Sequence, residues 1–416
     1  MTIPGAIASA VGHPPSAEAL EALEGCRRFL ADTALPIVEA FKGEHGDTTF
    51  ELRPDGRISD HALALKRTMQ ELAAREGLYA PHLPRADGGL GLGLVDCFYL
   101  QEEVFRHGLR GLQHTLAWTD GPSHLVRHWS PEMREAHLAP FLAGSTNVAF
   151  ALTEPGAGSD FPGLTTTGRR DGAAWILNGR KHLITGAPYA ELAQVFARRP
   201  DDPRGRLTAF LVPLDAPGVT RGAVQQTIMA DGQTGEIGLE DVALPASAVV
   251  GEVGSALPLA FLWINWARTR RGGMCSGLAR HCLSRAVGFA REREAFGRPI
   301  GELGAIASAV SDIALECEAM RALSLEALAR LDRSSIFEAV VTAADRATIS
   351  ILKTWNDEAL CRVADAAVQI HGGRGLLTEY GLEKIYRVAR NLRIPAGTTE
   401  VQRATIAQAL LGELSD

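Results

Sequence analysis

The spacing of the hydrophobic residues changes twice along the chain, and this change constrains the fold more than any other feature. Across residues 17–144 apolar side chains recur every three or four positions, which is the spacing of one face of a helix. Across residues 146–250 the period shortens toward two, in short β-branched or aromatic runs bounded by Gly, Pro and Asp. Such runs are typical of an antiparallel sheet or a small barrel. From residue 255 the helical spacing returns and continues to residue 414.

This order predicts an α+β protein with three domains. We expect an N-terminal helical domain at 1–145, a central antiparallel β-domain at 146–254 and a C-terminal helical bundle at 255–416. Strands and helices do not alternate, which disfavours a doubly wound nucleotide-binding fold. The glycine-rich stretch at 88–93 does not read GxGxxG, and it predicts a turn between helices.

Charge and composition exclude several classes of protein. The chain has 42 Lys and Arg against 49 Asp and Glu, a net charge of −7, which argues against a nucleic-acid-binding surface. No run resembles the ~20 apolar residues of a membrane span, and the first residues lack the pattern of a secretory signal. The six cysteines are scattered without a CxxC pair. We therefore expect reduced thiols, no metal site and a cytoplasmic location.

Four separated motifs carry the chemistry. They are ALTEPGAGSD at 151–160, NGRKHLIT at 178–185, REREAFGRPIG at 291–301, and a C-terminal run at 369–403 that contains QIHGGRG and GTTEVQR. In this order and at these separations they resemble the motifs of the acyl-CoA dehydrogenase superfamily. The resemblance spans most of the chain. It implies that superfamily's fold, an FAD cofactor and an acyl thioester substrate, carried by CoA or by an acyl-carrier protein.

The resemblance assigns flavin contacts to the first two motifs. In TEPGAGSD a proline and two glycines form an open turn that exposes backbone N–H groups and hydroxyls to a polar ligand. The resemblance implies that Thr153 faces the pyrimidine edge of the flavin and that Ser159 lies near the flavin or the pantetheine. Thr185 falls where a hydroxyl contacts flavin N5. Leu183 stands where many members carry a tryptophan packed on the ring.

The two later motifs imply contacts with the rest of FAD. Arg293 and Phe296 belong to RxxFG, and a guanidinium fork suits the pyrophosphate. Further positions matched to FAD are Gln369, Gly372, Gly373, Thr398, Glu400 and Gln402. In the superfamily the arginine and the glycine segment reach FAD bound largely to a neighbouring subunit. The resemblance therefore implies a homodimer or homotetramer, and an electron-transfer flavoprotein is a candidate redox partner.

The sequence departs from the superfamily at the catalytic base. Dehydrogenation needs an acceptor for the α-proton, usually a Glu just before the Gly-Thr of the last motif, and here that residue is Ala396. Some members place the Glu instead before an arginine of the C-terminal domain, which matches Arg268, and the residue before it is Ala267. No Asp or Glu occurs at 253–291 or at 384–399, so a shifted alignment restores neither base.

Three hypotheses follow from this departure. The first is α,β-dehydrogenation with a displaced base, for which Asp120 is the candidate by its match to the acyl pocket, with Glu154, His124 and His371 as weaker ones. The second is an elimination that needs no base, such as desulfination of a 3-sulfinoacyl-CoA. For that reaction Arg106 or Arg110 could bind the anion. The third is a catalytically silent partner subunit that keeps the FAD contacts.

Overall fold

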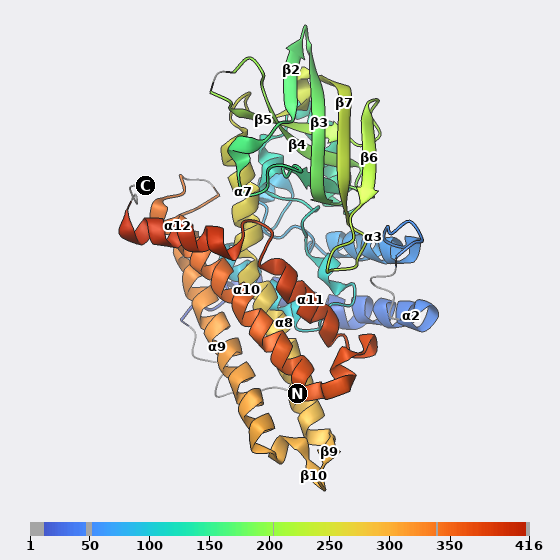
Figure 1. The fold of residues 1–416 in the computed structure, drawn as a ribbon, viewed down its shortest axis with the longest axis vertical. Helices are drawn as coiled ribbons and strands as arrows, with labels where there is room; N and C mark the ends of the chain where they lie inside the picture. The colour runs from blue at the N-terminus through green and yellow to red at the C-terminus, as the bar shows by residue number, and fades with distance from the viewer. Residues whose placement is uncertain (1–11, 47–51, 203, 338–339, 413–416) are drawn as a thin grey trace. The chain divides into compact units, whose positions relative to one another are not determined.

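The computed structural model describes residues 12–46, 52–202, 204–337 and 340–412. It confirms the predicted class, with helices at both ends of the chain and a sheet between them (Figure 1). The first strand begins at Val148 and the last strand of the large sheet ends at Val250, so the element type changes close to the predicted limits. None of the described helices is long and apolar enough to cross a membrane.

Among the described residues of the N-terminal part are four helices of eleven residues or more: α1 (Ala17–Phe29), α2 (Leu35–His45), α3 (Asp60–Arg75) and α4 (Leu94–Phe105). Ser16 and Ser59 cap α1 and α3 by accepting backbone N–H bonds, as expected of serine at this position. The 88–93 stretch connects two helical segments, and Gly88 and Gly91 have positive φ angles of 87° and 71° there. These angles explain why this turn is built from glycine.

The segment that includes Asp120 and Pro122 differs from the sequence-based interpretation, which treated it as helical. It contains only short 3-10 turns, at Leu112–Thr115 and His124–His128. Proline removes a backbone donor and disfavours helical geometry in the residue before it. The short helices α5 (Pro131–Met133) and α6 (Ala139–Leu142) follow.

One eight-stranded sheet fills the middle of the chain, in the order β6-β7-β3-β2-β4-β5-β8, with β1 on β4. Its strands are β1 (Val148–Ala151), β2 (Thr167–Asp171), β3 (Ala174–Thr185), β4 (Leu192–Arg198), β5 (Leu207–Pro213), β6 (Val219–Val224), β7 (Thr234–Pro245) and β8 (Val249–Val250). Pairing is antiparallel except where β4 runs parallel to β1 and β2. The register shifts between Lys181 and Ile184 on β3.

The C-terminal part of the chain is helical. Its helices are α7 (Ala256–Thr269), α8 (Arg271–Glu292), α9 (Gly304–Arg333), α10 (Ala343–His371), α11 (Leu382–Leu392) and α12 (Thr399–Leu411). Helix α10 packs against α8, α9, α11 and α12, and α4 packs against α8. The short hairpin of β9 (Glu294–Ala295) and β10 (Arg298–Pro299) follows the end of α8.

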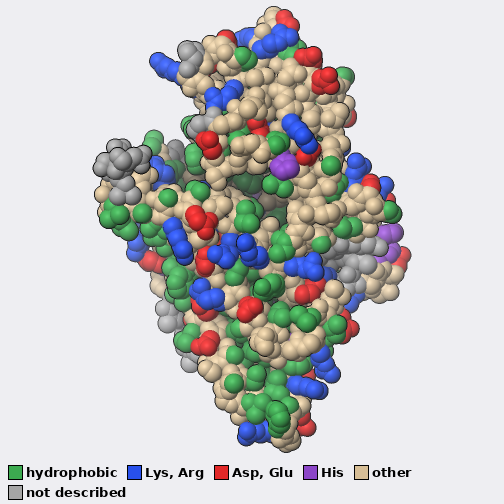
Figure 2. Space-filling model, viewed as in Figure 1, with side chains coloured by type: hydrophobic (Ala, Val, Ile, Leu, Met, Phe, Trp, Pro, Cys, Tyr) green, Lys and Arg blue, Asp and Glu red, His purple; other side chains and the backbone are tan. Residues whose placement is uncertain are grey.

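The chain forms two compact units, which we call the bundle unit and the sheet unit. The bundle unit contains residues 1–40, 92–113 and 267–416, and the sheet unit contains residues 41–91 and 114–266. Both units draw on the N-terminal helices, because α1 and α4 belong to the first and α3 to the second. On the face in Figure 2 positive and negative side chains are interspersed, as the small net charge predicts.

Candidate functional site

In the sheet unit, Thr153 and the end of β3 lie side by side. Thr153 follows β1, and its carbonyl oxygen accepts a 2.9 Å hydrogen bond from the backbone N–H of His182. Leu183 and Thr185 come directly after His182 on β3. The side chain of Leu183 is 52% exposed and its φ is 55°, at the register shift of the strand. Ser159 is exposed in the turn after Thr153.

Glu154 fixes the turn at residues 153–156, which we call the TEPG turn, to the sheet. Its carboxylate accepts hydrogen bonds from the N–H and hydroxyl of Thr165, from the N–H of Thr166, and from Lys181 Nζ at 2.8 Å. Burial opposes its ionisation, but the bonds from Lys181, Thr166 and Thr165 prevail and lower the Glu154 pKa to about 2. All these contacts are internal, so Glu154 has the environment of a structural carboxylate.

In the bundle unit, the predicted site residues fall into two groups at opposite ends of α8. Arg268 lies just before this helix and Arg293 just after it. A helix of 22 residues is about 33 Å long. Ala396, Thr398 and Glu400 group with Arg268, whereas Phe296, Gln369, Gly372 and Gly373 group with Arg293.

The group at the start of α8 centres on Ala396. Arg268 Nε donates a 2.8 Å hydrogen bond to the Ala396 carbonyl oxygen, and Ala396 has a φ of 61°. Thr398 caps α12 by accepting from Val401 N, and Glu400 is exposed. Gln402, one of the residues matched to FAD, is fully buried and bonds Gly397 and Ser350.

The group at the end of α8 is open to solvent. Phe296 is 91% exposed on the β9–β10 hairpin, with a φ of 54°. Gln369 lies near the end of α10, and Gly372 ends this helix with a φ of 57°. The end of α10 is placed beside α8 because His371 stacks on Phe289 at 4.4 Å between ring centroids.

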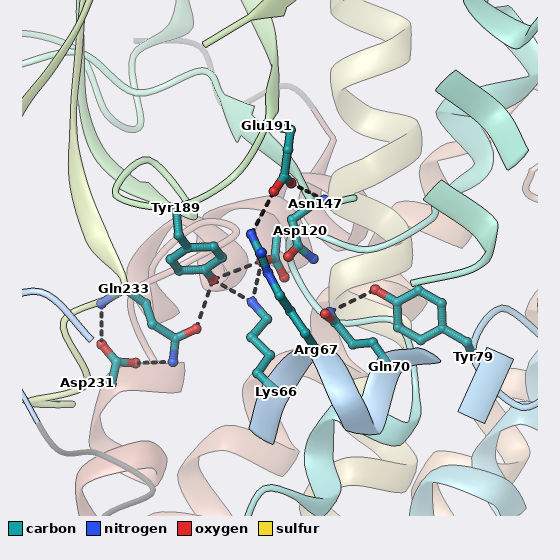
Figure 3. Close-up of polar contacts among 10 residues, drawn as sticks. All are labelled: Lys66, Arg67, Gln70, Tyr79, Asp120, Asn147, Tyr189, Glu191, Asp231 and Gln233. Carbon is teal, nitrogen blue, oxygen red and sulfur yellow. Dashed lines mark hydrogen bonds and ion pairs between the residues drawn. The ribbon is translucent and has the colours of Figure 1, made fainter. Parts of the chain in front are cut away.

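Asp120 lies in a buried polar network of the sheet unit (Figure 3). Its carboxylate is 0% exposed, pairs with Lys66 and accepts a 2.8 Å hydrogen bond from the Tyr189 hydroxyl. Tyr189 also lies 2.9 Å from Gln233 Oε1. Burial opposes ionisation of Asp120, but the Lys66 charge and the hydrogen bonds prevail and lower its pKa. A carboxylate already neutralised by a buried lysine is a weak proton acceptor, so these contacts argue against Asp120 as the base.

The two histidines considered as bases are also buried. His124 is 5% exposed and lies edge-on to Trp266, and burial lowers its pKa to about 3. His371 is 4% exposed, and its Nδ1 lies 2.8 Å from the Ala367 carbonyl oxygen. Both environments are typical of structural histidines.

Sequence reasoning missed Lys66 and Tyr189, which surround Asp120. They lie 54 residues before it and 69 residues after it. Only Lys66 gave a local signal, because it falls among the apolar positions of α3 and is fully buried there. A lysine on the apolar face of a helix predicts a buried acidic partner.

The arrangement suits a large planar cofactor with a phosphate tail. Exposed Leu183 and half-buried Thr185 offer an apolar surface beside a hydroxyl. Gly156, Gly158, Gly372 and Gly373 have open space where a Cβ would stand, so a ligand can approach their backbone closely. Within the sheet unit the surface at β3 fits the ring of FAD, and within the bundle unit Arg293 and the glycines fit its polar tail. Both are assignments to test.

Comparisons with known proteins agree with this picture. Residues 149–242 match the family model of the acyl-CoA dehydrogenase middle domain, and residues 257–411 match that of the C-terminal domain. The chain is 31% identical to the mitochondrial short-chain specific acyl-CoA dehydrogenase of Homo sapiens over 395 residues, 94% of this chain and 89% of that protein. It is 33% identical to the caffeyl-CoA reductase-Etf complex subunit CarC of Acetobacterium woodii over 344 residues, 81% of this chain and 88% of that protein.

A solved structure extends the likeness to the fold. The acyl-CoA dehydrogenase complexed with FAD from Bacillus anthracis superimposes with a TM-score of 0.80 at 26% identity, covering 96% of this chain and 68% of that chain. The expected fold and FAD cofactor are thereby confirmed, whereas the residue assignments stay predictions. The motifs, the fold and these relatives agree: the chain belongs to the acyl-CoA dehydrogenase family of FAD-dependent enzymes.

Proposed function

We propose that this enzyme acts on an acyl-CoA or acyl-carrier thioester by α,β-dehydrogenation, with an α-proton acceptor that is not a carboxylate at either of the family's base positions. The match to acyl-CoA dehydrogenases carries the reaction class, and a pair of alanines carries the departure from the family's base. Ala396 lies at one position, and Ala267 occupies the other and is 3% exposed. A methyl group accepts no proton.

Bound FAD supplies the acceptor for the two electrons and the β-hydrogen that this reaction removes. The chain's own contribution is to hold the ligand. The bond between Thr153 and His182 and the carboxylate of Glu154 fix the TEPG turn against β3, so that Thr153 and Thr185, which carry hydroxyls, are held in one rigid part of the sheet unit. Preorganised donors of this kind cost no rearrangement when the ligand binds.

A base-independent elimination is the second candidate, favoured by the same two alanines. In desulfination of a 3-sulfinoacyl-CoA the C–S bond breaks and its electron pair stays on the β-carbon, which takes a proton from water. The hydroxyl of that water joins sulfur, which leaves as sulfite. Carbon is reduced and sulfur is oxidised, so no external oxidant is consumed.

The separation of the predicted FAD contacts at the two ends of α8 supports a homo-oligomer. Predicted FAD contacts about 33 Å apart along one helix cannot all reach the same cofactor within one chain, so a second copy would contribute the Arg293 group. Hydrophobic side chains gather at the lower end of the face in Figure 2, where Figure 1 labels the β9–β10 hairpin. Phe296, Leu376 and Leu377 are 91%, 70% and 48% exposed. A homodimer or homotetramer would cover them.

The redox partner we propose is an electron-transfer flavoprotein. A relative at 33% identity is a subunit of a reductase-Etf complex. Oxidation of the reduced holoenzyme by a purified electron-transfer flavoprotein, followed anaerobically, tests this partner directly.

The decisive experiment is an anaerobic titration of the purified holoenzyme with straight-chain, branched and 3-sulfino acyl-CoA thioesters, followed by the visible spectrum. Loss of the oxidised flavin band supports dehydrogenation. A constant band with sulfite release supports elimination instead. A constant band with no product from any thioester contradicts both reactions and favours a silent subunit.

Ala396→Glu tests the base position. Placing a carboxylate there should create or raise the rate of flavin reduction by a saturated thioester, with Ala396→Gln as the matched control without a proton acceptor. Equal rates in both variants would show that a carboxylate at 396 is not what the reaction lacks.

A further inference from the structure

Arg268 is a cation that forms no ion pair with the described residues of its own unit. Its Nε bonds only a neutral carbonyl, that of Ala396 at 2.8 Å. No described carboxylate of the bundle unit forms an ion pair with it, and burial alone accounts for the lowering of its pKa to about 10. The guanidinium therefore stays charged at neutral pH.

The two arginines that the sequence offered for binding a sulfinate are already paired. Arg106 pairs with Glu103 at 3.4 Å, and Arg110 pairs with Glu39 at 3.1 Å. Deeper in the bundle the single carboxylate of Asp357 lies 3.0 Å from Lys353 and 3.9 Å from Arg271. That carboxylate is shared by two cations, so it does not offset the charge of Arg268.

The sequence on either side of this contact offers no carboxylate to offset the charge of Arg268. The two segments that meet at the contact of Arg268 with Ala396 are residues 253–291 and 384–399, and neither contains an Asp or Glu. Removing a cation from water without a counter-charge is costly, and a ligand that brings the anion removes this cost.

We infer that Arg268 binds an anionic group, a carboxylate or a sulfinate, that the substrate carries on its acyl chain. The inference rests on the proposed function, because it specifies the class of acyl thioester. It places the anion near the α- and β-carbons, since Ala396 stands where the family's base would meet the α-carbon. Arg268 keeps Nη1 and Nη2 for a planar two-oxygen acceptor, the geometry in which a guanidinium binds carboxylates best.

A matched ligand series tests the inference by affinity, without relying on turnover. Butyryl-CoA, succinyl-CoA and 3-sulfinopropionyl-CoA are alike except that the terminal methyl is replaced by a carboxylate or a sulfinate. Dissociation constants are measured on the holoenzyme by calorimetry and by the shift of the flavin spectrum. We expect one or both anionic ligands to bind about 10-fold to 100-fold more tightly than butyryl-CoA, as for a charge-assisted hydrogen bond. The tighter of the two identifies the anion.

Two variants assign this preference to Arg268. Arg268→Met should bring the anionic and neutral dissociation constants within about twofold of each other, whereas the matched control Arg110→Met should keep the preference. Ala396→Glu leaves Arg268 in place and supplies a carboxylate beside it, so it should abolish the preference even if Arg268→Met fails to fold.

The outcomes separate this inference from the proposed function. The role of Arg268 is overturned if the wild type binds all three ligands with equal affinity, or if the preference for the anionic ligands survives both Arg268→Met and Ala396→Glu. Either result remains compatible with an enzyme that acts on a neutral acyl thioester. Failure of all three ligands to bind overturns the inference and the thioester proposal together.

Discussion

Three predicted site residues have left-handed backbone conformations that favour glycine. Leu183, Phe296 and Ala396 have φ angles of 55°, 54° and 61°. This conformation costs an L-residue roughly 1–2 kcal/mol, and strain of this kind is often found at functional sites. All three lie in motifs that the sequence singled out, so their backbone geometry independently supports a site there.

Replacing Ala396 with glycine should stabilise the fold. Relief of the left-handed strain exceeds the entropy lost by glycine on folding, so we expect Ala396→Gly to raise the free energy of unfolding by up to about 1 kcal/mol. The measurement is the midpoint of urea unfolding. Ala267→Gly, inside α7, is the control and should lower stability by about 1 kcal/mol. Equal losses in both variants would contradict strain at Ala396.

The polar contacts of Asp120 predict that its substitution lowers stability and leaves flavin reduction unchanged. Asp120→Asn leaves Lys66 buried without its counter-charge and should cost about 3–5 kcal/mol, measured by urea unfolding. The rate of flavin reduction by a good thioester should be unchanged in the folded fraction. The double variant Lys66→Met, Asp120→Leu removes both charges and should recover much of the lost stability. A loss of flavin reduction with stability retained would instead identify Asp120 as the base.

At the level of elements, the TEPG turn depends on the buried pair of Glu154 and Lys181. Each of the first two motifs contributes one of the two side chains, and their exposure is 4% and 0%. This pair explains why a turn rich in glycine keeps a fixed position against β3.

Glu154→Gln should destabilise the enzyme by roughly 3 kcal/mol at pH 7, because Lys181 then lacks its counter-charge. The folded-state pKa of Glu154 is lowered from 4.5 to about 2. Its contribution is therefore complete above about pH 4.5 and is lost as the pH falls toward 2. Urea unfolding of both proteins across this range should show their difference shrinking with acid. A difference that is constant down to pH 2 would contradict the pairing.

At the level of the whole molecule, a second copy of the chain is required if the Arg268 group and the Arg293 group, at opposite ends of α8, both bind FAD. Phe296→Asp should place a charge in the proposed interface, shift the protein to smaller assemblies in light scattering and increase the FAD lost on gel filtration. Leu20→Asp, on α1 and 50% exposed, is the control and should change neither. Full FAD retention by a monomeric Phe296→Asp variant would refute the shared site.

The sequence by itself determined the order of the elements and the identity of the family. Hydrophobic period is a local property, so the change from helix to strand was visible at 146 and from strand to helix at 255, within a few residues of the first strand at Val148 and of α7 at Ala256. The motifs are also local, and the loss of the base at Ala396 needs only the sequence to be read. Pro122 shows a limit even at this scale, since apolar spacing around it suggested a helix that proline chemistry prevents.

Tertiary structure alone decided which charges are neutralised. Asp120 meets Lys66 and Tyr189 across 54 and 69 residues, and no local spacing encodes such a contact. The same holds for Arg110, which pairs with Glu39 across 71 residues, and for Arg268, whose contact is a carbonyl 128 residues away. The charge of a side chain can be read from the sequence, but its electrostatic state depends on burial and partners, which exist only after the chain has folded.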